Sequence, residues 1–170
     1  PVGYKVFQLA WHISSFHAVR PSTKWLWVER NLIENALSLL KLRENMNQSR
    51  STWASSRPLQ MDGIETSNYY QEVLLQVAII NCPLRSHLAR LPKESWLHLG
   101  YEDLVKEPQI YMSKIARFSG ISLSKNESFI DGMNYRGRDS YAAEDVEQAE
   151  SALASLRKNT DLATYFPTIP

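Results

Sequence analysis

The sequence predicts an α/β fold, in which helices alternate with a small number of strands. Two short runs, at residues 24–29 and 96–100, are rich in aromatic and apolar residues and have the composition of strands. Apolar residues at helical spacing follow the first run, and a long helical pattern lies between the two runs. The alternation of strand and helix patterns along the chain therefore predicts the α/β class.

The first strand is expected over Lys24–Glu29, and it leads directly into a helix predicted over about residues 31–45. Asn31 is the predicted N-cap, and Glu34, three residues on, completes a pattern close to a capping box. Arg30 therefore stands where a strand ends and a helix begins. In open α/β sheets, ligands bind at this edge.

Arg30 and Ser38, about two turns further along the helix, have the chemistry to bind a phosphate. The guanidinium supplies charge and a bidentate fork, and the hydroxyl supplies a donor. A helix N-terminus also attracts anions through its free N–H groups. The alternative is an arginine in a surface salt bridge and a serine on a polar helix face, because strand–Arg–helix junctions are common in α/β folds.

The patterns in the first half of the chain predict three further features. Residues 4–9 fit a strand or the entry into a helix, and residues 10–19 have a rough helical pattern. A long helix is expected over about residues 67–90. The polar stretch 47–66 before it is predicted to be a long loop of the kind that shapes an acceptor site. Trp53 in this loop is expected to cover a ligand or to pack on the core.

The second strand is expected over residues 96–100. A tight connection, residues 101–108, is expected to lead from it into a helix over 108–119. Proline is tolerated at the first turn of that helix, and Gly120 is the predicted C-cap. Residues 124–141 look irregular. A last amphipathic helix is predicted over about residues 142–157.

The composition is that of one ordinary globular domain over residues 1–170. A net charge of +1 implies no general affinity for nucleic acid or membranes, so an anion site must be local. Cys82 is the single cysteine, so no internal disulfide forms and a reducing, cytoplasmic compartment is expected. No apolar run approaches the roughly 18 residues of a membrane span, and no spacing of His and Cys predicts a metal site.

Two motifs together resemble the sulfotransferases that use 3′-phosphoadenosine 5′-phosphosulfate. In that family a strand ends in an arginine, as at Arg30, and a serine lies eight residues on, as at Ser38; both hold the 3′-phosphate of the donor. A Tyr-Glu-Asp-Leu segment, here from Tyr101, follows downstream with a proline, here Pro108, and a helix that ends in Phe-Leu-Gly. Ser119 replaces that leucine. The resemblance implies a P-loop-like parallel sheet flanked by helices.

The resemblance also implies further donor ligands. Tyr101 would lie near the adenine or the 3′-phosphate, and its alternative role is that of a core tyrosine. Arg136, Gly137 and Arg138 fit a basic loop over the 3′-phosphate, with a solvated charged turn as the alternative. Lys5, in a Gly-x-Lys stretch similar to that of bacterial carbohydrate sulfotransferases, would contact the donor; the alternative is a lysine at a strand edge.

The catalytic base stays open. His12 is the histidine nearest the edge and is a candidate. In the family's cytosolic branch the base is a histidine two residues after the lysine, and that position is Phe7 here. A base from an upstream segment is equally compatible. The family's Ser/Thr/Gly-rich phosphosulfate loop has no counterpart, and with Pro1 in place of an initiator methionine we expect that loop and the first strand to lie upstream.

The resemblance thus implies transfer of a sulfuryl group to an acceptor hydroxyl, with a small molecule or a carbohydrate as the acceptor and no metal. The alternative is a non-catalytic nucleotide-binding or interaction module derived from the same fold. The identity of the acceptor and the oligomeric state do not follow from the sequence.

Overall fold

The computed structural model describes residues 8–122 and 137–166, and the chain divides into two compact units. The sheet unit consists of residues 1–31 and 85–137, and the helical unit of residues 32–84 and 138–170. The expected single domain over the whole chain stays a prediction. The mixed α/β class is confirmed by a parallel sheet flanked by helices.

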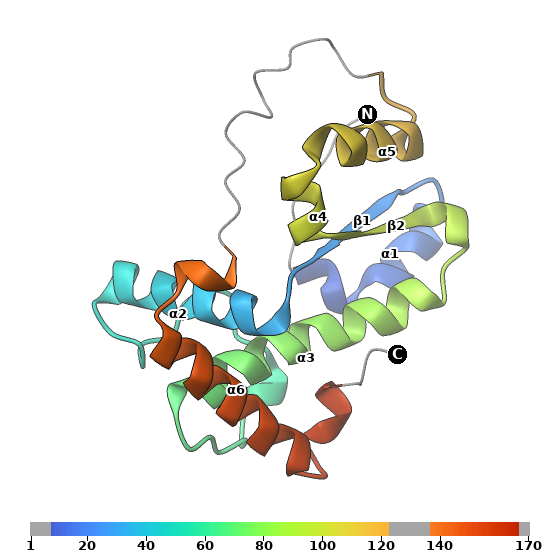
Figure 1. Cartoon of the computed structure of the whole chain (residues 1–170). Coiled ribbons are helices and arrows are strands. Elements are labelled where there is room, and N and C mark those ends of the chain that lie inside the picture. Colours follow the sequence, from blue (N-terminus) through green and yellow to red (C-terminus); the bar gives the residue numbers. More distant parts are fainter. Residues whose placement is uncertain (1–7, 123–136, 167–170) are drawn as a thin grey trace. The chain divides into compact units, whose positions relative to one another are not determined.

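The sheet unit is built on two parallel strands, β1 (Trp25–Glu29) and β2 (Trp96–Gly100), both as predicted. The strands pair in register from Trp25 opposite Trp96 to Glu29 opposite Gly100. Both strands therefore end side by side, and the chain leaves them at one edge of the sheet. Helices α4 and α5 lie on one side of the sheet and α1 on the other (Figure 1). Their bounds are Ile13–Val19 for α1, Tyr101–Lys106 for α4 and Pro108–Ser119 for α5, with 3₁₀ turns at Gln8–Trp11 and Lys93–Ser95.

The two faces of β1 differ in exposure. Trp25 and Trp27 are half-buried, and Phe16 of α1 packs edge-on against Trp25 with ring centroids 5.6 Å apart. Leu26 and Val28 on the opposite face are each 44% exposed. In the described part of the chain β1 has β2 as its only strand neighbour, so the prediction of a strand is confirmed but its burial is limited to one face.

The expected tight connection at residues 101–108 is wrong, because most of it forms the helix α4. Glu102 and Asp103 in its first turn favour a helix N-terminus, and Leu104 is buried. The residue before Pro108 is pushed out of the helical region, which separates α4 from α5. At the end of α5, Gly120 is the C-cap as predicted, with φ 68°.

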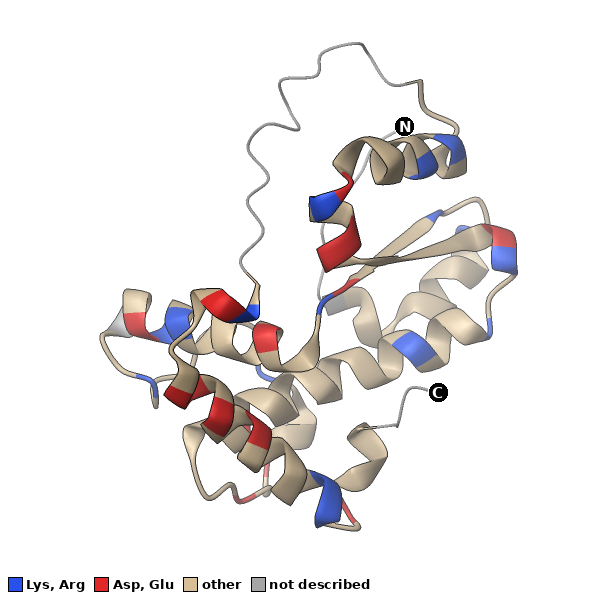
Figure 2. Cartoon of the chain, in the orientation of Figure 1, with Lys and Arg blue, Asp and Glu red and all other residues tan. Residues whose placement is uncertain are grey.

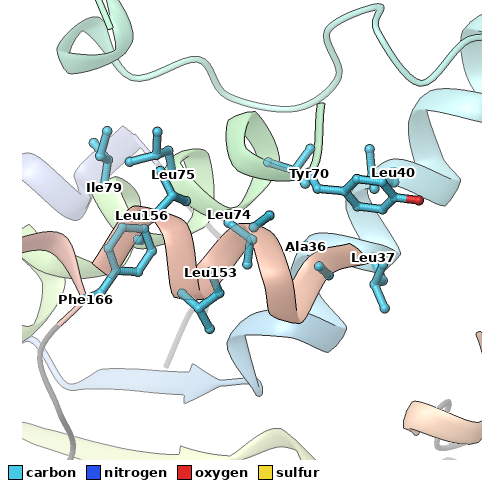
Figure 3. Close-up of a cluster of buried hydrophobic side chains, with 14 of the residues drawn as sticks. Ala36, Leu37, Leu40, Tyr70, Leu74, Leu75, Ile79, Leu153, Leu156 and Phe166 are labelled. Carbon is cyan, nitrogen blue, oxygen red and sulfur yellow. The ribbon is translucent and has the colours of Figure 1, made fainter. Parts of the chain in front are cut away.

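The helical unit packs α2 (Leu32–Asn47), most of α3 (Tyr69–Ala89) and α6 (Ala143–Lys158) around one core. All three helices agree with the predicted ranges to within about two residues, which is the normal uncertainty of helix ends. Figure 3 shows apolar side chains of the three helices meeting in this core. In α6 the acidic residues lie toward the start and two basic residues at the end (Figure 2), as the helix dipole favours. Short 3₁₀ turns occupy Leu59–Met61, Arg138–Ser140 and Ala163–Tyr165.

The loop between α2 and α3 is held from inside by two buried polar side chains. Arg43, with 0% exposure, donates to Gln76 Oε1 at 3.1 Å and to the carbonyl of Arg50 at 3.2 Å. Gln76 in turn donates from Nε2 to the carbonyls of Ala54 and Ser56, at 3.1 and 2.8 Å. A buried polar group stabilises a structure only when it is bonded, so these contacts fix the course of the loop.

Trp53 of this loop packs against the core of the helical unit, one of its two expected roles. Two guanidinium groups lie over its ring, those of Arg43 and Arg57, whose central carbons are 4.9 and 5.4 Å from the ring centroid. Each contact has the geometry of a cation–π interaction.

A second network joins the loop to α3 and α6. Arg50 donates from both terminal nitrogens to Asp145, at 2.5 and 3.0 Å, and also bonds Glu44 and the hydroxyl of Tyr70. The guanidinium of Arg50, together with the Tyr70 hydroxyl, holds the pKa of Asp145 below its usual range. Burial raises the pKa of Tyr70, and its bond to Asp145 adds to the effect.

Asp145→Asn is expected to lower the free energy of unfolding at neutral pH by about 1–3 kcal/mol, because it weakens charge-assisted bonds. Since the folded pKa of Asp145 lies below the unfolded value of about 3.9, the stabilisation is complete above the unfolded pKa and is lost as the pH falls through the folded pKa. Urea denaturation of parent and variant should therefore give a constant difference near neutral pH that shrinks in acid.

Asp62→Asn is a matched control. Asp62 pairs with Arg57 at 2.6 Å, but both side chains are more than half exposed, at 57% and 54%. Its loss should change stability by less than about 1 kcal/mol. Equal stability of Asp145→Asn and the parent near neutral pH would contradict the proposed role of the network.

Candidate functional site

Arg30 and Tyr101 meet where the two strands end. Arg30 directly follows β1, and Tyr101, the first residue of α4, directly follows β2. The guanidinium carbon of Arg30 lies 5.0 Å from the centre of the Tyr101 ring. Both residues are half-buried. The structure therefore brings together two of the residues that the sequence singled out, at the edge of the sheet expected to bind a ligand.

The residues that follow Arg30 and Tyr101, which are Asn31 and Glu102, also contact each other. The backbone N–H of Asn31 donates to Glu102 Oε1 at 2.9 Å. The Glu102 side chain thus accepts a backbone hydrogen bond from the chain that leaves β1. The turn that carries Arg30 is thus tied to the start of α4.

Glu29, the last residue of β1, holds the end of that strand in place through two side-chain partners. Its carboxylate is paired with Arg85 of α3, and its Oε2 lies 3.0 Å from His98 Nε2 on β2. The ring of His98 lies 4.4 Å from that of Trp27, centroid to centroid. The Glu29 side chain is only 17% exposed, so this cluster fixes the end of β1 beside Arg30.

The sequence pointed to none of these roles for Glu29, Arg85 and His98. Glu29 shares a face of β1 with two tryptophans, and that alternation was a signal that its carboxylate needs a partner. Arg85 lies 56 residues away, in a helix, and no local pattern connects the two.

The other candidates are distributed over both units. Ser38 is half-buried in α2, and Arg138 is exposed and paired with Glu150 at 2.5 Å. Gly137 is half-buried and precedes the 3₁₀ turn at Arg138–Ser140. His12 is exposed and immediately precedes α1, where its carbonyl accepts the N–H of Phe16. Lys5 and Arg136 lie outside the described residues.

A pocket in the helical unit has a volume of about 110 Å³ and is lined by Leu37, Leu40, Lys41, Glu44, Arg50, Ser140, Tyr141, Ala142 and Asp145. Ligand sites are usually about 300–1,000 Å³, so this pocket is too small for an adenosine nucleotide. Three of its charged residues also bond one another, because Arg50 pairs with both Glu44 and Asp145.

Residues 8–122 and 137–166 contain neither a cluster of metal ligands nor a helix suited to a membrane. No three His, Cys, Asp or Glu residues there come together in a group fit to hold a metal ion. None of the helices in that part of the chain has the length and apolar character required to cross a membrane.

Comparison with known proteins gives one result. The family model described as "Sulfotransferase domain" matches residues 7–157, which is most of the chain. This match confirms the family that the two motifs resemble. Searches of curated proteins and of solved structures gave no match.

Glu29→Ala is expected to lower the free energy of unfolding by about 1–3 kcal/mol, because it removes bonds to two partners and leaves the Arg85 charge unbalanced. Urea denaturation followed by tryptophan fluorescence measures the change, since Trp27 contacts both His98 and Arg85. Glu150→Ala, which breaks the exposed pair with Arg138, is the control and should cost less than about 1 kcal/mol. Indistinguishable curves for Glu29→Ala and the parent would refute the anchoring role.

Proposed function

The chain belongs to the sulfotransferase family, and we propose that it transfers a sulfuryl group from 3′-phosphoadenosine 5′-phosphosulfate to an acceptor hydroxyl. The observation that carries the proposal is the contact of Arg30 with Tyr101 where the parallel strands end. A cationic fork supported by an aromatic ring suits a phosphate of the donor.

Arg30 is the proposed ligand of the donor's 3′-phosphate. A guanidinium can lie against an aromatic ring and still use its N–H groups for a bidentate bond to phosphate. The two interactions are therefore compatible in one side chain. The ring of Tyr101 would in addition lie close to the 3′-phosphate or the adenine.

The remaining donor ligands are proposed from the family resemblance alone. Ser38 would donate its hydroxyl to the 3′-phosphate, and Lys5 would add a charge. The turn Arg136-Gly137-Arg138 would supply two further cations, with Gly137 allowing the backbone to approach the phosphate closely. For Arg138 such a role requires exchange of its exposed pair with Glu150, which costs little.

The donor supplies the sulfuryl group, so the work left to the protein is positioning and charge stabilisation, as in phosphoryl transfer. The acceptor oxygen forms a bond to sulfur as the bond from sulfur to the 5′-phosphate oxygen breaks, and the acceptor proton passes to a base. His12 is one candidate for that base. No metal is part of the proposal.

The proposed acceptor is a small molecule or carbohydrate that presents a hydroxyl. The sugar class rests on the similarity around Lys5 to bacterial carbohydrate sulfotransferases. We also propose a cytoplasmic location, because Cys82 is the single cysteine of the chain. The second candidate function is a nucleotide-binding module without transfer activity, which would keep the Arg30 site and lack turnover.

Calorimetric titration with adenosine 3′,5′-bisphosphate, the spent donor, tests the site. Arg30→Ala should weaken binding about ten- to a hundredfold, because a charge-assisted phosphate contact contributes about 1.5–3 kcal/mol. Arg90→Ala, which removes an exposed arginine of the same unit, should bind like the parent.

Equal binding by Arg30→Ala and the parent would overturn the assignment of Arg30, and absence of binding by the parent would overturn donor recognition by this chain. Turnover of the donor with hydroxyl acceptors then separates the two candidate functions: binding without transfer to any acceptor favours the module.

A further inference from the structure

The residues that follow the two strands form matched contacts, pair by pair. Glu29 and Gly100 are opposite each other as the last residues of β1 and β2. One residue on, the guanidinium carbon of Arg30 lies 5.0 Å from the centre of the Tyr101 ring. Two residues on, the Asn31 N–H donates to Glu102 Oε1 at 2.9 Å. The start of α4 thus holds both the side chain of Arg30 and the backbone just after it.

The bond to Glu102 controls a backbone angle of Arg30. The N–H of Asn31 and the carbonyl of Arg30 belong to one planar peptide unit. A bond that holds this N–H against the start of α4 therefore restrains ψ of Arg30 and holds in place the backbone from which the arginine side chain extends. A carboxylate acceptor makes the bond stronger than a neutral one.

Glu102 is itself well placed to act as an anchor. It is half-buried and lies in the first turn of α4, where the helix dipole favours a negative charge. A negative charge this close to a phosphate site would weaken anion binding by repulsion, unless its structural contribution outweighs that cost. The hydrogen bond of Glu102 should therefore strengthen donor binding, and its negative charge should weaken it. Different substitutions separate these two effects.

We propose that Glu102 is a positioning residue for the donor: its bond to Asn31 orients Arg30 toward the 3′-phosphate. This inference rests on the proposed function, in which Arg30 binds that phosphate. Glu102 need not touch the nucleotide, and its effect passes through the Arg30–Asn31 peptide.

Calorimetric titration of the parent and three variants with adenosine 3′,5′-bisphosphate tests the proposal. Glu102→Ala removes the acceptor and should weaken binding about tenfold. Glu102→Gln keeps an oxygen at the same reach and should restore affinity to that of the parent or better, since the repelling charge is gone. Glu102→Asp keeps the charge but is one methylene shorter, and should lose affinity as the alanine variant does.

Two controls make the effect specific to the 3′-phosphate. Glu107→Ala removes an exposed carboxylate just after α4 and should bind like the parent. Adenosine 5′-monophosphate, which lacks the 3′-phosphate, should bind parent and Glu102→Ala equally. The amide of Asn31 gives a readout without ligand: its hydrogen exchange should accelerate in Glu102→Ala and stay slow in Glu102→Gln.

The outcomes separate this inference from the proposed function. If Arg30→Ala loses affinity while Glu102→Ala binds like the parent, the positioning role is refuted and the donor site stands. If both Glu102→Ala and Glu102→Gln bind more tightly, the carboxylate acts by repulsion alone, which also refutes the role. If the parent fails to bind the bisphosphate, both proposals fall. Should Glu102→Ala not fold, the opposite effects of Gln and Asp decide the matter.

Discussion

The parallel pairing of β1 with β2 is the constraint on which the candidate site depends. The register places Glu29 opposite Gly100, so the next residues of both strands leave the sheet together. Arg30 and Tyr101, as well as Asn31 and Glu102, are 71 residues apart in sequence and meet only because of this register. A slip of one residue would reverse the faces of every side chain on one strand and separate these pairs.

Ionic and polar contacts that are at least partly buried secure both units. In the sheet unit Glu29 joins β1 to Arg85 of α3 and to His98 of β2. In the helical unit Arg43 and Arg50 hold the loop between α2 and α3 from inside. Breaking one partner of such a contact leaves an uncompensated charge, so these contacts favour one arrangement of each segment over alternatives that packing alone would allow.

The strands and long helices were predictable because their signals are local. The aromatic and apolar composition of Trp25–Glu29 and Trp96–Gly100 predicts the two strands. Pro108 and Gly120 likewise mark the two ends of α5. The short helix α4 was missed because six residues between a strand and a proline contain less than two helical turns of pattern. The exposure of Leu26 and Val28 was missed because an apolar run does not reveal which of its faces is covered.

The candidate site was predictable only in part. The two motifs identified the family and selected Arg30 and Tyr101, and the structure places these two side chains in contact. The partnerships of Glu102 with Asn31 and of Glu29 with Arg85 join residues far apart in the chain, and no periodicity encodes them. The burial of Arg43 was equally hidden, because a charged residue on a helix is normally exposed and its partner Gln76 lies on another helix.

The most direct test of the central claim is a crystal structure of the protein with adenosine 3′,5′-bisphosphate. We expect the 3′-phosphate beside the end of β1, with its oxygens about 2.7–2.9 Å from the guanidinium nitrogens of Arg30 and the Asn31 N–H still bonded to Glu102. A nucleotide bound away from this edge, with Arg30 making no contact to it, would contradict the claim.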